Sequence, residues 1–249
     1  MPKKEIFENY MSLIYSSSER ENNIDEEYER LYFWNKKYIG AALPENKESR
    51  FLDIGCGLGQ NLHTFSKLGY RNIKGIDISP ECVAFCEKQG FVVEKISAEE
   101  YLKDRADFFD VITIYHVVEH IEKKQIVPFL SILKDALKAG GKLIVNIPNG
   151  NNAIGGMHDR YTDITHEILY TPESMREVLL LSGFEAKNIA IEELVAYAPD
   201  DKRFMGKLLK KIILPLITKL VDLVWYVFFI SQGATPRKNR PVLLAISKK

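Results

Sequence analysis

Short apolar runs alternate with longer amphipathic stretches along the middle of this 249-residue chain. The runs predict strands at 73–77, 92–96, 110–115 and 142–148. The stretches between them predict helices at about 58–69, 80–89, 98–103 and 122–138. Strands that alternate with helices form a parallel sheet covered on both faces, so the pattern predicts an α/β fold.

Local signals support two of these helix boundaries. The segment Ser79–Glu81 supplies an N-cap serine, a proline and an acid for the first turn of the helix at 80–89. The segment Lys138–Gly141, a basic residue followed by glycines, is typical of a helix end. We therefore expect the following strand to begin at about residue 142.

A glycine-rich turn follows an apolar run at 51–60. The run ends in Asp53, glycines then alternate with other residues up to Gly59, and a second strand-like run ends in Asp77. The carboxyl ends of neighbouring parallel strands bind nucleotide-like ligands, and glycine lets the backbone approach them closely. A carboxylate on the second strand can accept hydrogen bonds from ribose hydroxyls. These features predict an enzyme with such a cofactor.

Two residues of this turn separate the cofactor classes. Gln60 occupies the position where the dinucleotide fingerprint has glycine or alanine, and Asp53 precedes the glycines, where its charge would repel a pyrophosphate. S-adenosylmethionine (SAM) has no phosphate and carries a sulfonium, an ammonium and an adenosine ribose. The sequence therefore favours SAM over a nicotinamide dinucleotide.

The segment Leu52–Gly59 resembles the first motif of the class I SAM-dependent methyltransferases, and the likeness extends over 48–190 and weakly over 240–247. This resemblance implies a doubly wound, mostly parallel seven-stranded sheet of the Rossmann-like methyltransferase type. The last strand, at 241–247, would run antiparallel between its neighbours. Together with the glycine turn, the resemblance implies that the following residues bind SAM: Asp53, Gly55, Cys56, Gly57, Asp77, Ile78, Glu99 and His116. An ordinary helix first-turn acid is the alternative for Glu99.

Composition bears on the cellular setting. The 34 basic and 34 acidic residues cancel, so no overall field points to nucleic acid. Three cysteines without metal-like spacing indicate a reducing compartment, and Cys82 and Cys86 share a helix face as packing residues. No long apolar segment follows the first residues, so we expect a cytoplasmic enzyme without a secretory signal.

The N-terminal region is predicted to be a helical cap. From Ile24 an acidic first turn leads into aromatic residues at helical spacing. The simpler interpretation is a helix packed on the sheet. The alternative is that Tyr28, Tyr32 or Trp34 closes over the cofactor.

Polar residues directly follow the strand at 110–115. They are His116, Glu119 and His120, and in an open sheet they would face the crevice. The stretch resembles the fourth motif of methyltransferases that act on small hydroxylated molecules. That likeness places His116 beside the methionine end of SAM, and Glu119 or His120 towards the acceptor. A mutual hydrogen-bonded brace between Glu119 and His120 is the alternative.

The segment at 149–171 is predicted to be a long substrate loop. Its polar side chains suit an acceptor with several hydroxyls or a phosphate, and they are His158, Asp159, Arg160, Asp163, His166 and Glu167. Their spacing matches no standard zinc motif, so no metal is predicted, although histidines with carboxylates are compatible with a divalent ion. The loop and the Thr171–Ser174 helix start resemble bacterial methyltransferases of lipopolysaccharide, O-antigen or capsule gene clusters.

The resulting hypothesis is an O-methyltransferase for a sugar or glycan intermediate of surface-polysaccharide biosynthesis. Another hydroxylated small molecule such as a quinone precursor, a nicotinamide-dependent enzyme and a non-catalytic SAM-binding partner protein are the alternatives. Methyl transfer depends on alignment of the acceptor with the cofactor. A base removes the hydroxyl proton, and His166, His120 and His158 are candidates in that order, with Glu119 as a further catalytic candidate.

A basic and then very apolar stretch occupies 202–230. Pro215, Lys219 and Asp222 interrupt its apolar part, which disfavours a membrane span. An in-plane amphipathic helix at the inner face of a membrane and a packing or homodimer helix are both open. The predicted domains are a cap at 1–48 and a SAM-binding domain at 49–249, which includes the substrate loop at 149–171 and an amphipathic insertion at 200–235.

Overall fold

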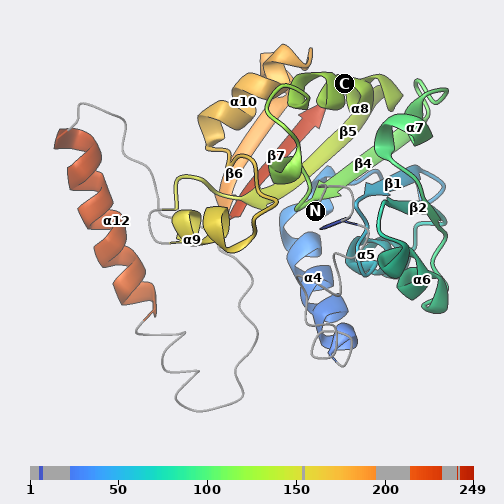
Figure 1. Ribbon diagram of the computed structural model, residues 1–249, viewed down its shortest axis with the longest axis horizontal. Coiled ribbons are helices and arrows are strands. Elements are labelled where there is room, and N and C mark those ends of the chain that lie inside the picture. Colours follow the sequence, from blue (N-terminus) through green and yellow to red (C-terminus); the bar gives the residue numbers. More distant parts are fainter. Residues whose placement is uncertain (1–5, 8–22, 153–154, 195–213, 232–239, 241) are drawn as a thin grey trace.

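The computed structural model describes residues 6–7, 23–152, 155–194, 214–231, 240 and 242–249. Its centre is a single seven-stranded sheet (Figure 1). In chain order the strands are β1 (Arg50–Ile54), β2 (Asn72–Asp77), β3 (Val93–Lys95), β4 (Phe109–Tyr115), β5 (Leu137–Pro148), β6 (Ile189–Leu194) and β7 (Val242–Lys248).

The spatial order of the strands is β3-β2-β1-β4-β5-β7-β6. Strand β7 is antiparallel to β5 and β6, and the other pairs are parallel. The order reverses between β1 and β4, and ligands of open α/β sheets bind outside the carboxyl ends of the strands at such a point. The doubly wound fold and the antiparallel last strand predicted from the resemblance are confirmed.

Helices cover both faces of the sheet (Figure 1). In chain order the helices are α4 (Ile24–Tyr38), α5 (Gln60–Lys67), α6 (Pro80–Lys88), α7 (Ala98–Leu102), α8 (Ile126–Ala136), α9 (Gly155–Thr162), α10 (Pro172–Leu181) and α12 (Leu214–Ser231). Helix α12 lies apart from the sheet, on the side where β6 forms the edge (Figure 1). Buried side chains of α7, α8 and α10 share one core with the strands. Those of α4 and α5 share a second core with the strands. Short 3₁₀ turns lie at η1 (Gly40–Ala42), η2 (Val118–His120) and η3 (Ala186–Asn188).

Side-chain caps fix two helix starts in the way the sequence predicts. The Ser79 hydroxyl accepts a hydrogen bond from the backbone of Cys82, with proline in the first turn of α6. Thr171 and Ser174 form a reciprocal capping box at the start of α10. The cap of α10 therefore fixes where the predicted substrate loop ends and the helix begins.

The junction of α8 and β5 differs from the prediction. The helix ends at Ala136 and the strand begins at once, instead of at about residue 142. The pairing to β4 shifts register, and Leu137 and Lys142 are the paired residues on the two sides of the shift. Gly140 lies at a φ of 80°, which lets the chain bulge between these pairings. The glycines mark this bulge instead of a helix end.

The predicted irregular loop at 149–171 contains a helix, α9, in its described part. Of the predicted cap at 1–48, residues 1–5 and 8–22 lie outside the described residues. In the described part, α4 packs against α5, and its buried Asn35 hydrogen-bonds to Asn61 and Thr64 of that helix. All three cysteines are buried and free. Among the described helices, none combines the length and hydropathy needed to traverse a bilayer.

Candidate functional site

A cavity of about 620 Å³ opens at the carboxyl ends of β1, β2 and β4. All eight residues expected to bind the cofactor line it: Asp53, Gly55, Cys56, Gly57, Asp77, Ile78, Glu99 and His116. Gln60, Trp34 and His120 line the same space. The cavity therefore gathers the candidate cofactor residues from the ends of β1, β2 and β4 and, for Glu99, from α7 after β3, as the switch-point rule predicts.

The glycine turn brings backbone close to this cavity. The amides of Gly55 and Cys56 both donate to the Ile76 carbonyl, at 2.9 and 3.1 Å, which ties the turn to β2. Gly55 has a φ of 66°, and a Cβ there would lie 2.3 Å from a methyl of Val117. Only glycine fits this position without displacing the loop that follows β4.

Asp77, at the end of β2, supports the turn. One carboxylate oxygen accepts from the Gly57 amide at 2.9 Å and the other from the Ser79 amide at 2.8 Å. Burial raises the pKa of Asp77, and these two backbone hydrogen bonds oppose that rise. Each carboxylate oxygen can accept more than one hydrogen bond, so the side chain retains capacity for ribose hydroxyls.

Asp53, at the end of β1, is 2% exposed and still lines the cavity. The same oxygen accepts from Thr113 Oγ1 at 2.6 Å and from Asn61 Nδ2 at 3.0 Å. Burial raises the pKa of Asp53 to about 7, despite these two bonds and with a further contribution from the charge of Asp77. A cationic group in the cavity would favour the ionised form.

The loop after β4 carries His116 in a left-handed conformation, with a φ of 55°. Its amide donates to the Asn146 carbonyl, and its Nδ1 lies 3.3 Å from a carboxylate oxygen of Glu119. Glu119 is fully buried, and neither of its carboxylate oxygens has a hydrogen bond of good geometry to a described residue. Burial alone would raise the pKa of Glu119, but the adjacent His116 lowers it overall. Strained backbone of this kind is concentrated at functional sites.

His120 lines the cavity and is positioned by the segment after α9. Its Nδ1 lies 2.8 Å from Thr165 Oγ1, and the Thr165 hydroxyl donates to Asp163 Oδ1 at 2.6 Å. Since that hydroxyl has only one proton, its oxygen must accept from His120, which assigns the proton to Nδ1 and the lone pair to Nε2. Burial lowers the pKa of His120, so the neutral ring prevails at pH 7. This arrangement suits a proton acceptor at Nε2.

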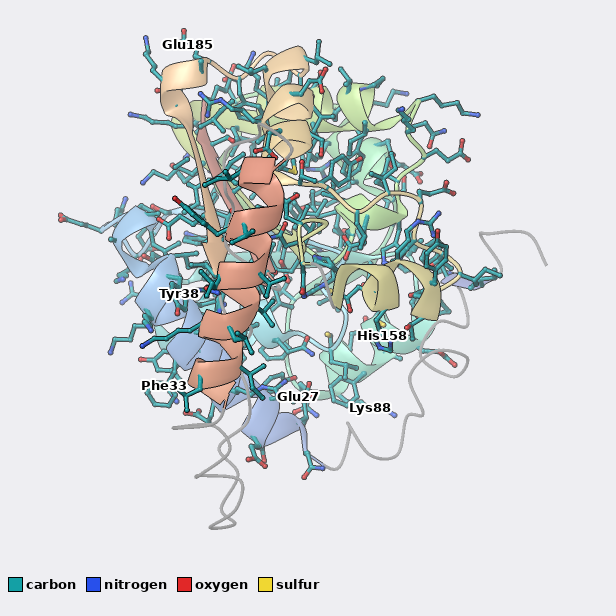
Figure 2. All side chains as sticks on the ribbon, turned by 90° about the vertical axis from the view of Figure 1, so that its left-hand side faces the viewer. Glu27, Phe33, Tyr38, Lys88, His158 and Glu185 are labelled. Carbon is teal, nitrogen blue, oxygen red and sulfur yellow. The ribbon has the colours of Figure 1, made fainter. Side chains whose placement is uncertain are left out.

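His166 and His158 differ from His120 in position. The His166 ring lies beside the His120 ring, with centroids 4.7 Å apart, and its Nδ1 donates to the Asp159 carbonyl at 2.5 Å. His158 is exposed on α9 (Figure 2). Neither ring is among the residues lining the cavity. The geometry therefore favours His120 as the base, a different order from the one that the sequence suggested.

Glu119, His120 and His166 place one potential ligand atom each within 4.8 Å of the others. This spacing is compatible with a divalent ion. The two rings use Nδ1 for their hydrogen bonds, His120 to Thr165 and His166 to the Asp159 carbonyl, and Glu119 lies 3.3 Å from His116 Nδ1. Such Nδ1 bonds are also found at metal sites, where they orient the other ring nitrogen, so they do not decide the question. The expectation of no metal therefore stays a prediction, with these three residues as the place to test it.

Helix α4 closes one side of the cavity. Trp34, Leu31, Arg30 and Glu27 line it, whereas Tyr28 and Tyr32 do not. The Tyr28 hydroxyl instead donates to the Leu58 carbonyl at 2.6 Å, which holds α4 against the glycine turn. Of the three aromatic candidates, Trp34 is the one in position to contact a ligand.

Sequence reasoning missed the residues that orient the charged groups. Thr113 and Asn61 hold Asp53, and Thr165 holds His120. Each is a buried polar residue on a strand, helix or turn that looks ordinary in the sequence. Their partners lie far along the chain, so no local pattern could reveal them.

Comparison with known proteins identifies the family. A family model described as a methyltransferase domain matches residues 24–188. The mitochondrial ubiquinone biosynthesis O-methyltransferase of Rattus norvegicus is 27% identical over 161 residues, which are 57% of this chain and 46% of that protein. The ubiquinone biosynthesis O-methyltransferase of a Bradyrhizobium species is 31% identical over 106 residues, 41% of each chain. The matches thus span less than half the length of these curated relatives.

Solved structures share the fold over most of the chain. A SAM-dependent methyltransferase from Archaeoglobus fulgidus has a TM-score of 0.65 at 24% identity, covering 89% of this chain and 94% of that one. Phosphoethanolamine N-methyltransferase 2 of Haemonchus contortus, solved with SAM, has a TM-score of 0.63 at 18% identity, covering 98% and 60%. The family match, the sheet order and the cavity agree, and they exclude the nicotinamide-dependent alternative. The chain belongs to the class I SAM-dependent methyltransferases.

Proposed function

We propose that this methyltransferase transfers the methyl group of SAM to a hydroxyl oxygen of a small molecule, with His120 as the proton acceptor. The observation that carries the proposal is the position of His120. It lines the same cavity as Asp53 and Asp77, and Thr165 holds it in the tautomer whose Nε2 accepts a proton. The acceptor oxygen forms its bond to the methyl carbon as the sulfur–carbon bond breaks, and the hydroxyl proton passes to Nε2.

The other cavity residues position the reactants. We assign the ribose hydroxyls to Asp77, the ammonium to Asp53 and the close backbone approach to the turn at Gly55 and Gly57. The sulfonium loses its charge as the methyl leaves, so the enzyme gains most by aligning oxygen, carbon and sulfur in a space that excludes water. Trp34 on α4 covers one side of that space.

The acceptor that fits this base best is a phenolic hydroxyl, as in a quinone precursor. A neutral histidine with a lowered pKa is a weak base, and a phenol with a pKa of about 10 gives up its proton far more readily than an alcohol. The relatives named for ubiquinone biosynthesis support this acceptor class. A sugar hydroxyl is the second candidate, because exposed His158 and Glu167 present polar groups on the segment that carries Thr165.

The test measures methyl transfer from labelled SAM to two acceptor panels, catechols and nucleotide sugars. We expect product with catechols, and His120→Ala should lower turnover by roughly 10²–10⁴-fold with unchanged affinity for S-adenosylhomocysteine. His158→Ala, an exposed histidine of the same segment, is the matched control and should retain turnover if the acceptor is phenolic. Full turnover of His120→Ala would remove that residue from the mechanism, and product with sugars alone would reassign the acceptor.

A further inference from the structure

Helix α12 presents an apolar face that no described residue covers. Seven aliphatic side chains form this face, and each is roughly half to two-thirds exposed. They are Leu216, Ile217, Leu220, Leu223, Val224, Val227 and Ile230. At about 100° per residue they fall on one side of the helix and run along most of its length. An aliphatic face of this size marks a site of interaction.

The opposite side of α12 faces the rest of the protein. Asp222 forms an ion pair with Arg240 at 3.1 Å, and the Arg240 carbonyl accepts from Asn149 Nδ2 at 2.8 Å, just beyond the end of β5. Val221 and Asp222 are only partly exposed. Figure 1 shows α12 at the side of the molecule where β6 forms the edge of the sheet, and in Figure 2, viewed from that side, α12 lies in front of the rest of the protein. The apolar face therefore points away from the protein.

The sequence on both sides of α12 is basic. Before the helix, 202–213 contains five lysines or arginines and no acid, and after it 232–241 contains three and no acid. Basic residues near an apolar helix attract anionic lipid headgroups. The same charges oppose pairing of two copies through α12, since basic segments would meet in either relative direction.

We propose that the outer face of α12 lies in the surface of a bilayer that contains anionic lipid. No described helix is both long and apolar enough to cross a membrane, and the two charged residues of α12, Lys219 and Asp222, fall outside the aliphatic face. An in-plane helix buries its apolar side among the upper acyl chains while flanking basic residues contact headgroups. The ion pair to Arg240 then links the membrane-bound helix to β7 and the sheet.

Vesicle flotation of the full chain tests this proposal. The vesicles contain phosphatidylcholine alone or phosphatidylcholine mixed with phosphatidylglycerol. We expect flotation with the anionic vesicles, weakened by added salt, and at least about tenfold weaker partitioning for the double variant Leu220→Glu and Leu223→Glu. The matched control is Val92→Glu with Leu181→Glu, two equally exposed apolar residues on the body of the protein.

Binding of S-adenosylhomocysteine to each variant shows that it is folded. No flotation of the wild type, or equal loss in both double variants, would overturn the proposal. Concentration-dependent dimerisation that Leu220→Glu abolishes, without vesicle binding, would reassign the face to a second copy. These outcomes are independent of the acceptor assay, because soluble acceptors report on the cavity and not on α12.

Discussion

At the residue scale, the site depends on buried polar groups that orient one another. Asp163 holds the Thr165 hydroxyl, and Thr165 in turn fixes the tautomer of His120. Asn61 and Thr113 likewise donate hydrogen bonds that orient the Asp53 carboxylate. Buried groups of this kind must be satisfied, because an unmade hydrogen bond costs about 1–3 kcal/mol, so each orientation is held firmly.

We predict that Thr165→Val lowers kcat by about tenfold or more while the KM for SAM stays the same, because the His120 ring loses its orienting partner. The Thr165→Ser variant, which keeps the hydroxyl, should have the wild-type kcat. The lowered pKa of His120 places the acid limb of the rate profile below pH 6.5, since the neutral ring is the active form. A pH profile of kcat checks this, and a Thr165→Val enzyme with normal kcat would contradict the role.

We predict that affinity for S-adenosylhomocysteine rises with pH through the titration of Asp53. Its pKa of about 7 leaves it largely protonated at pH 6, whereas the ligand's ammonium favours the carboxylate. Affinity should increase about tenfold from pH 6 to 8. Titration calorimetry measures this, and Asp53→Asn should bind with little pH dependence. In the free protein, the contribution of Asp53 to the free energy of unfolding has the opposite pH dependence. It is fully present below about pH 4 and is lost as pH rises through about 7, because the folded state binds the proton more tightly than the unfolded state.

Chelation separates the two readings of the Glu119, His120 and His166 cluster. We expect EDTA to leave turnover unchanged, because the proposed proton transfer to His120 needs no metal ion. Dialysed enzyme assayed with and without added Mg²⁺ or Zn²⁺ provides the measurement. Loss of turnover on chelation and recovery with one of these ions would establish a metal at the cluster.

At the element scale, α4 is joined to the cofactor site by a polar chain. Tyr115 donates to Asn35 Oδ1, Asn35 donates to Asn61 Oδ1, and Asn61 donates to Asp53. All three bonds lie in the interface between α4, α5 and the strand ends. Docking of α4 therefore orients a carboxylate on β1 as well as closing the cavity with Trp34.

We predict that Asn35→Leu destabilises the protein by about 1–3 kcal/mol, since Tyr115 and Asn61 lose a buried partner. It should also weaken binding of S-adenosylhomocysteine, because Asn61 is no longer held toward Asp53. Urea unfolding and titration calorimetry measure the two effects. Lys36→Ala, an exposed change on the same helix, is the control, and equal effects of the two variants would refute this coupling.

At the scale of the whole molecule, the cavity lies where the two halves of the sheet meet. The cavity draws residues from the ends of β1, β2 and β4, from α4 and from the loop after β4. A ligand that contacts all of these stabilises the folded state by mass action. Global stability therefore reports on cofactor binding.

We predict that S-adenosylhomocysteine at about 100 times its dissociation constant stabilises the protein by about 2.7 kcal/mol, and that NADH does not. Asp77→Ala should remove most of this stabilisation, because it deletes the ribose acceptor and the brace of Gly57. Thermal unfolding with each ligand gives the measurement. Stabilisation of Asp77→Ala equal to that of the wild type would exclude Asp77 from the binding site.

Local sequence predicted most of the strands, the glycine turn and the starts of α6 and α10, but not β6. Together with the family resemblance it also named eight residues that line the cavity. These features depend on short-range chemistry: apolar periodicity, glycine conformations and carboxylates at strand ends. The same signals misplaced the start of β5, because two glycines mark a bulge as well as a helix end. The sequence between Lys138 and Lys142 is compatible with either a bulge or a helix end. The pairing of β5 with β4 decides for the bulge.

Tertiary structure alone decided which polar residues act together. Asp163 and Thr165 meet His120 across 45 or so residues of chain, and Thr113 meets Asp53 across 60. Such pairings arise from the sheet order, which sequence spacing does not encode. The orientation of α12, with Asp222 turned to Arg240 and the aliphatic face outward, depends likewise on a long-range ion pair. The sequence by itself thus determined the class of cofactor and the fold, and packing decided which histidine lines the cavity and which side of α12 forms the ion pair.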